Sequence, residues 1–394
     1  MGIGLHLRVA LSGFATRYRK FWLFAAVVLA WSSLGVSEPA LAQTCTPVSN
    51  PGTLAAASPS TNCTGTFNTN INFGGPTTPP PSVLTLTLQS GGVIVNSPGG
   101  DAINLANSTG GIATIGTSAT LTANDVTVSN TSSPNTPNQS GLRIQTSGSA
   151  TITASGQISV IGAQSTNAIW AIVLPSSDPN TVASVVYNGP GVTSVGTTFS
   201  TVIQADNRGT GPSIIDAAGN MTGVALGSAA SGVTGLFASS SAGTNKLASV
   251  HYGSGTIDVR GTFANGIFAS GNSSTVTTDP GTTIIVRSLT GERLKPGIAL
   301  DSSGTAAAGH TLTATVASTI QMLGPAAADP NLRNDGLGIR AFSFQDAPGS
   351  VTFLPTRARS ICKATPSPAT CSSSPAGAKQ ALPDPAHTSR MAAR

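Results

Sequence analysis

A short phrase returns at near-regular intervals through the middle of this 394-residue chain. In "GTIDVRGTFANGIFASG", from Gly255 to Gly271, an alternating apolar run ends in Arg, a turn-rich gap follows, and Gly-Ile opens a second run. Related second runs lie 27 to 41 residues apart and begin at Gly141, Ala168, Thr201, Gly235, Gly266, Gly297 and Gly338. A degenerate repeat of this length, whose turns vary while its strands keep their length, is typical of a solenoid.

Each repeat also contains a weaker run before these two, such as "KLASVHYG" at Lys246. Three short strands per repeat, separated by Gly, Ser, Asn and Asp turns, predict one coil of a right-handed parallel β-helix. Alternation along "TIDVRG" places Ile257 and Val259 inside the coil and Asp258 and Arg260 in solvent. The phrase therefore returns because each coil must fit onto the coil before it.

Composition and charge exclude several classes of protein. Only two Glu occur, and charged residues make up 8% of the chain, which argues against a helical protein. The net charge of +5 comes from the two ends, because residues 43–355 hold nine basic and twelve acidic side chains. No Lys/Arg stripe exists to contact phosphates, so we expect no nucleic-acid partner.

The first 42 residues are expected to form an export signal with a helical apolar segment. A basic region ends at Lys20, the apolar run Phe21–Trp31 follows, and the small residues Ala40 and Ala42 predict cleavage before Gln43. The basic region is unusually long, which fits either a mis-assigned start codon or an extended signal. The expected division is 1–42 signal, 43–82 cap or linker, 83–355 β-helix and 356–394 disordered tail.

The four cysteines form two close pairs in the sequence, Cys45 with Cys63 and Cys362 with Cys371. In an oxidising compartment the first pair would close a short loop just after the cleavage site, so a structural disulfide between Cys45 and Cys63 is predicted. Whether Cys362 and Cys371 pair stays open. Neither pair has the spacing of zinc ligands, and no metal site or cofactor is expected.

The repeated Gly-Ile-x-Ala phrases, the Ser/Thr/Gly/Asn richness and the long signal resemble the passenger region of autotransporters, the type V secreted proteins of Gram-negative bacteria. The resemblance covers roughly residues 1–355. It implies export through the signal and display at the cell surface or in the outer membrane, or secretion. The C-terminal translocator barrel that the family carries has no counterpart here, and a truncated reading frame would leave a periplasmic product.

No catalytic residue is predicted, and the protein is not expected to be an enzyme. The Asp side chains occur mostly once per coil and suit turns, there is no Asp-x-Asp pair, and His251, His310 and His387 stand isolated in the sequence. The alternatives to an adhesin-like or structural display module are a β-helix enzyme acting on polysaccharide and a non-functional remnant of a larger gene. The display module and the enzyme differ in whether acidic side chains converge on one face, and a remnant would be recognised from the downstream DNA and a lack of expression.

One surface feature stands out. The outward positions of successive second runs place Trp170, Ile203, Phe237 and Phe268 in one exposed column. Large apolar groups in water often mark an interface, so this stripe is the candidate contact for an unknown protein or glycan on a host or cell surface. A covering loop, or a reversed in/out phase in some coils, would remove it.

Overall fold

A computed structural model describes the part of the chain that carries the repeat. All described residues belong to the second of two compact units, Ala42–Arg394. They are residues 44–46, 60–68, 70–73, 83–88, 93–97, 99–106, 108–109, 112–113, 118–131, 139–162, 164–176, 178–225, 227, 231–240, 246–288, 296–302, 310–323, 338–343, 349–355 and 360–361. The predicted signal helix lies outside them, as does almost all of the predicted tail.

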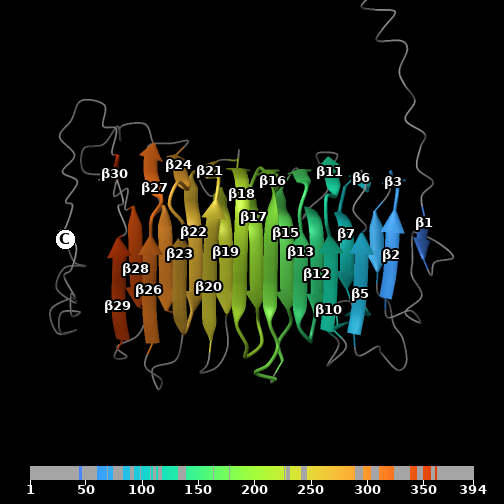
Figure 1. The fold of residues 1–394 in the computed structure, drawn as a ribbon, viewed down its shortest axis with the longest axis horizontal. Coiled ribbons are helices and arrows are strands. Elements are labelled where there is room, and N and C mark those ends of the chain that lie inside the picture. The colour runs from blue at the N-terminus through green and yellow to red at the C-terminus, as the bar shows by residue number, and fades with distance from the viewer. Residues whose placement is uncertain are drawn as a thin grey trace, which may run out of the picture. The chain divides into compact units, whose positions relative to one another are not determined.

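The described chain is an all-β parallel solenoid, in which each coil contributes one strand to each of three columns (Figure 1). The first column contains β2 (Ser60–Thr64), β5 (Val83–Leu88), β10 (Ser118–Ala123), β13 (Ala150–Ala154), the first halves of β16 (Ala183–Gly196) and β18 (Ser213–Ala225), β20 (Leu247–Ser254), β23 (Ser273–Thr278), β26 (His310–Val316) and β29 (Gly349–Pro355). The second column contains β3 (Thr66–Phe67), β6 (Ile94–Ser97), β11 (Thr127–Thr131), β14 (Gln157–Ile161), the second halves of β16 and β18, β21 (Thr256–Gly261), β24 (Thr283–Ser288), β27 (Thr319–Leu323) and β30 (Ser360–Ile361).

The third column is a nine-stranded sheet of its own. It contains β4 (Ile71–Phe73), β7 (Asp101–Ala106), β12 (Gln139–Thr146), β15 (Ser165–Val173), β17 (Phe199–Asn207), β19 (Gly232–Ser240), β22 (Phe263–Gly271), β25 (Ile298–Ser302) and β28 (Ile339–Ser343). Outside the columns, β1 (Thr44–Thr46) pairs antiparallel with β2, and β8 (Ser108–Thr109) pairs antiparallel with β9 (Ile112–Ala113). Among the described residues no helix is long and apolar enough to cross a bilayer.

One continuous core runs through the stack from Cys63 to Ile320. It is built from ladders of like residues, because each strand pairs in register with its equivalents in the neighbouring coils. The inner ladder of the third column is Ile71, Ile103, Leu142, Ile169, Ile203, Leu236, Ile267, Ile298 and Ile339. Each fully buried Ile or Leu contributes roughly 1.5–3 kcal/mol of transfer free energy, so the ladders hold the coils together.

The expected alternation is confirmed in β21, where Ile257 and Val259 are fully buried while Asp258 and Arg260 face solvent. The tight corner between the first and second columns uses a glycine with a positive φ, which other residues rarely adopt. Gly219 has a φ of 106° there, and a Cβ on it would lie 1.9 Å from the carbonyl oxygen of Gly189.

The solenoid extends beyond the boundaries expected from the sequence, 83 and 355. At the N-terminal side, β2, β3 and β4 already pair in parallel with β5, β6 and β7, so the first coil begins at Ser60 rather than Val83. At the other end, Ser360 and Ile361 pair with Ile320 and Gln321 of β27, inside the segment expected to be a disordered tail. β3, β4 and β30 contain only two or three residues each, so they carry too little of the repeated pattern to be recognised.

Candidate functional site

The outward side of the third column, from β15 to β22, carries the predicted stripe. In the ladder Trp170 pairs with Gln204, Gln204 with Phe237, and Phe237 with Phe268. We call these four residues the aromatic row. Trp170, Phe237 and Phe268 point outward and are half-buried, as one expects of side chains that cover one another.

The placement of Ile203 in the stripe was wrong. Ile203 is fully buried and pairs with Ile169 and Leu236 of the inner ladder, and Gln204 takes the outward position. The reason is that two consecutive side chains, Val202 and Ile203, both face inward at this point. Strict alternation from Thr201 therefore assigns the residues after Val202 to the wrong side of the strand. Ala168 and Ile169 show the same pair of inward residues in β15.

Ring contacts are made at both ends of the aromatic row. The rings of Phe237 and Phe268 lie 5.2 Å apart between centroids and 13° from parallel. At the N-terminal end of the row, the guanidinium carbon of Arg143 lies 5.1 Å from the Trp170 ring centroid, a cation–π contact. Arg143 is held there by Asp101, whose Oδ2 lies 2.6 Å from its Nη1.

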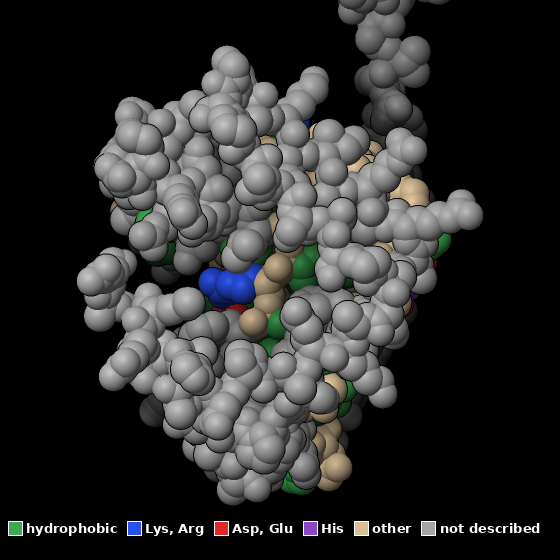
Figure 2. Space-filling view, turned by 90° about the vertical axis from the view of Figure 1, so that its left-hand side faces the viewer, with side chains coloured by type: hydrophobic (Ala, Val, Ile, Leu, Met, Phe, Trp, Pro, Cys, Tyr) green, Lys and Arg blue, Asp and Glu red, His purple; other side chains and the backbone are tan. Residues whose placement is uncertain are grey.

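The other end of the row is also followed by a paired arginine. Ala299 and then Arg340 succeed Phe268 in register, and Arg340 Nη2 lies 3.1 Å from both carboxylate oxygens of Asp301. Figure 2 views the stack from its C-terminal end, where a basic group lies against an acidic one among hydrophobic side chains. Arg143 and Arg340 thus flank the aromatic row, and each is neutralised by an aspartate, Asp101 or Asp301.

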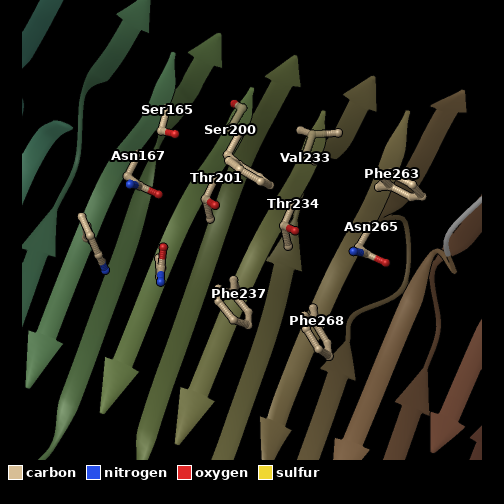
Figure 3. Close-up of a pocket in the computed structure, with 14 residues that line it drawn as sticks. Ser165, Asn167, Ser200, Thr201, Val233, Thr234, Phe237, Phe263, Asn265 and Phe268 are labelled. Atoms are coloured by element: carbon tan, nitrogen blue, oxygen red, sulfur yellow. The ribbon is translucent and has the colours of Figure 1, made fainter. Parts of the chain in front are cut away.

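A groove of about 610 Å³ runs over the same four strands. Its lining includes the aromatic row and two further rows of residues near the N-terminal ends of the same strands (Figure 3). The polar row is Asn167, Thr201, Thr234 and Asn265, and the rim row is Ser165, Phe199, Gly232 and Phe263. The polar row lies between the other two, and Phe199 in the rim row is 55% exposed.

The chemistry of the groove is neutral and rich in unused hydrogen-bonding groups. None of its fourteen lining residues is ionisable. Within the described part of the chain, the side chains of Gln204 and of the polar row make no hydrogen bond. Each amide offers two N–H donors and an acceptor oxygen, and each hydroxyl offers one donor and an acceptor oxygen. The groove can therefore bind an uncharged ligand that both donates and accepts hydrogen bonds.

His251 is not isolated, contrary to what the sequence indicated. On the outward side of the first column its Nδ1 lies 2.7 Å from Asp216 Oδ1, and its Nε2 lies 3.2 Å from Asp279 Oδ1. Partial burial lowers the pKa of His251, but the hydrogen bonds and charges of Asp216 and Asp279 outweigh it and raise the pKa above its usual value. These contacts connect β18, β20 and the turn after β23. Sequence reasoning missed them because His251 lies 35 residues from Asp216.

The remaining described carboxylates are spread over the columns and do not converge. Asp258 on the second column accepts two hydrogen bonds from Arg287, at 2.8 and 3.0 Å, and Asp206 on the third column accepts one from Arg208 at 2.8 Å. Among the described residues, no group of three or more His, Cys, Asp or Glu is placed to hold a metal ion. Most of these carboxylates thus form ion pairs with arginine side chains of the solenoid.

The first predicted cysteine pair is brought together by the register of the N-terminal strands. Cys63 is fully buried and disulfide-bonded, and Cys45 on β1 is its partner across the β1–β2 ladder. Cys362 and Cys371 lie outside the described residues.

Comparison with known proteins adds no relative. No family model, no curated protein and no solved structure matches the chain.

Proposed function

We propose that this chain is an exported module, similar to an autotransporter passenger, that displays the outward side of its third column at the cell surface and binds a ligand there. The observation that supports the proposal is the aromatic row beside a neutral groove on a continuous parallel sheet. Side chains on strands hydrogen-bonded on both sides are held in place before a ligand arrives, which reduces the ordering cost of binding.

Export is tested by producing the full chain in a Gram-negative host and fractionating the cells. We expect a product outside the cytoplasm whose first residue, by mass spectrometry, is Gln43. Ala40→Leu with Ala42→Leu should block cleavage because both small residues are lost, whereas Leu41→Phe between them should not. A full-length chain that stays in the cytoplasm would overturn the proposal.

Binding through the third column is tested with the double variant Trp170→Ser, Phe237→Ser. We expect purified variant protein to lose adhesion to cell surfaces that the unchanged protein binds. A matched control is Ile161→Ser with Val186→Ser, which removes exposed apolar side chains, 44% and 37% exposed, from the other two columns. Equal adhesion of the two double variants would retire the aromatic row as the contact surface.

A further inference from the structure

We infer that the groove between the aromatic row and the rim row binds a neutral, linear oligosaccharide that lies along the solenoid axis. The inference rests on the proposed function and names its ligand class. It draws on three properties of the groove: its direction across the strands, its lack of charge, and the kinds of side chain on its sides.

The direction of the groove favours a ligand whose repeat matches the coil. The lining rows run from β15 through β17 and β19 to β22, across three coil-to-coil spacings. Parallel strands lie about 4.8 Å apart, so the groove presents equivalent positions over about 14 Å. A pyranose unit is about as long as one such spacing. An extended peptide advances only about 3.3 Å per residue and would fall out of step with the rows.

The backbone of these strands also disfavours a peptide added as a further strand. β17 and β19 pair with a neighbour on both sides, and β15 and β22 do so as well, so their N–H and C=O groups are engaged in the ladder. Strand addition needs a free sheet edge, and the groove lies on a sheet face. Recognition must therefore come from side chains, and the ligand must supply its own donors and acceptors.

The side chains supply what hydroxyl groups need. Asn167 and Asn265 stand at the two ends of the polar row with Thr201 and Thr234 between them, and no described residue hydrogen-bonds to these side chains. Within such a row, each sugar unit can exchange hydrogen bonds with one coil.

The aromatic row complements this polar row. Because Phe237 and Phe268 stack on each other along the axis, their ring edges rather than their faces line the groove. Ring edges carry partial positive charge and attract the oxygen atoms of sugar hydroxyl groups. The absence of ionisable groups from the lining means that an anionic sugar would lose hydration without gaining a counter-charge.

The test uses the full chain with Trp22→Phe and Trp31→Phe, which leaves Trp170 as its one tryptophan. Its fluorescence is titrated with cellotetraose, laminaritetraose, mannotetraose and maltotetraose, and with tetragalacturonate as an anionic sugar of equal length. We expect saturable binding of at least one neutral tetraose, with affinity that rises at least tenfold from the corresponding disaccharide to the tetraose and then levels off. Tetragalacturonate should bind at least tenfold more weakly.

The variant Asn167→Ala with Asn265→Ala should weaken binding of that tetraose at least tenfold. The control Asn188→Ala with Thr193→Ala removes an amide and a hydroxyl from the other columns and should leave the affinity unchanged. The inference is overturned if no neutral tetraose binds at concentrations up to about 10 mM, if tetragalacturonate binds as well, or if both variants behave alike. Self-association of the chain that Trp170→Ser abolishes would assign the groove to a second copy and would also overturn it.

The proposed function and this inference are tested by different measurements, so either can be contradicted without the other. Export and adhesion are measured on cells without added sugar, so adhesion without binding of any neutral tetraose overturns only the ligand class. If the chain binds a tetraose but remains in the cytoplasm, the proposal of export is contradicted and the inferred ligand class stands.

Discussion

Gly266 lies at a close approach between neighbouring coils within the repeated phrase. A Cβ there would lie 2.3 Å from Ile284 Cγ2 and 2.6 Å from the carbonyl oxygen of Gly297. Its φ is not positive, so the glycine serves close approach rather than an unusual backbone conformation. Gly266 thus has a different role from Gly219, whose positive φ lies in the left-handed region.

Gly266→Ala should lower the free energy of unfolding by about 1–3 kcal/mol, because the added methyl group overpacks the core. Gly338→Ala is the matched control, since Gly338 holds the same register position but a Cβ there would meet nothing within 4 Å. Urea denaturation measures both. Equal effects in the two variants would mean that the close approach does not limit stability.

His251 makes the stability of the solenoid depend on pH. Its folded-state pKa is raised above the ordinary 6.5. The protonated ring therefore stabilises the folded state, fully so below the unfolded-state pKa, and this contribution is lost as the pH rises through the raised folded-state value. The His and both Asp side chains are more than 40% exposed, so the contribution should not exceed about 1 kcal/mol.

We therefore expect the unchanged protein to melt above His251→Gln at pH 5, with the difference shrinking as the pH rises past the raised pKa of His251. An NMR titration of the His251 ring checks the cause: the pKa should fall in Asp216→Asn, which removes one partner. A melting difference that grows with pH would contradict the assigned contacts.

At the scale of single strands, alternation predicts which side chains face inward but not where alternation breaks. β21 follows its sequence pattern throughout, whereas β17 turns both Val202 and Ile203 inward. Val202 stands at the register position that a glycine holds in most coils. Gly223 of the second column packs against it, and a Cβ on Gly223 would lie 3.1 Å from Val202 Cγ2. A large residue on one strand is thus matched by a small one on another, a compensation that one strand alone does not reveal.

Contacts between charged side chains of successive coils were equally hidden in the sequence. The interval between successive coils varies, so Asp216 could not be aligned with His251 until the register was known. The groove was missed for the same reason, because its polar row is recognisable only when Asn167 and Asn265 are placed on equivalent positions of β15 and β22. The inner ladders were predictable because like residues recur there.

The stacked pair Phe237 and Phe268 should contribute to coil-to-coil stability beyond the area it buries. In a double-mutant cycle with Phe237→Leu and Phe268→Leu, we expect a coupling of about 0.5–1.5 kcal/mol, because Leu keeps apolar area but loses the ring contact. Chemical denaturation of the four proteins measures it. A coupling indistinguishable from zero would show that the rings merely lie side by side.

At the scale of the whole molecule, a solenoid should respond locally to local damage, since each coil contacts mainly its neighbours. Cys63→Ser should raise hydrogen exchange in β1, β2 and β5, because a disulfide that anchors the first coil is removed. Exchange in β19 and β22 should not change. The control Cys362→Ser with Cys371→Ser should leave β2 and β5 as they are, and a rise in exchange throughout the chain would contradict the local behaviour.

The central claim is that successive coils stack in register along one axis, and pulsed electron spin resonance distances test it most directly. Spin labels are attached at outward first-column positions in a protein with Cys362→Ser and Cys371→Ser. Thr120 with Ile214 spans three ladder steps, Thr120 with Thr275 spans five, and Thr85 with Thr313 spans seven. The label separations should grow linearly, at about 4.8 Å per step. Separations that do not increase with the number of steps, or broad distributions without a maximum, would contradict the stacked solenoid.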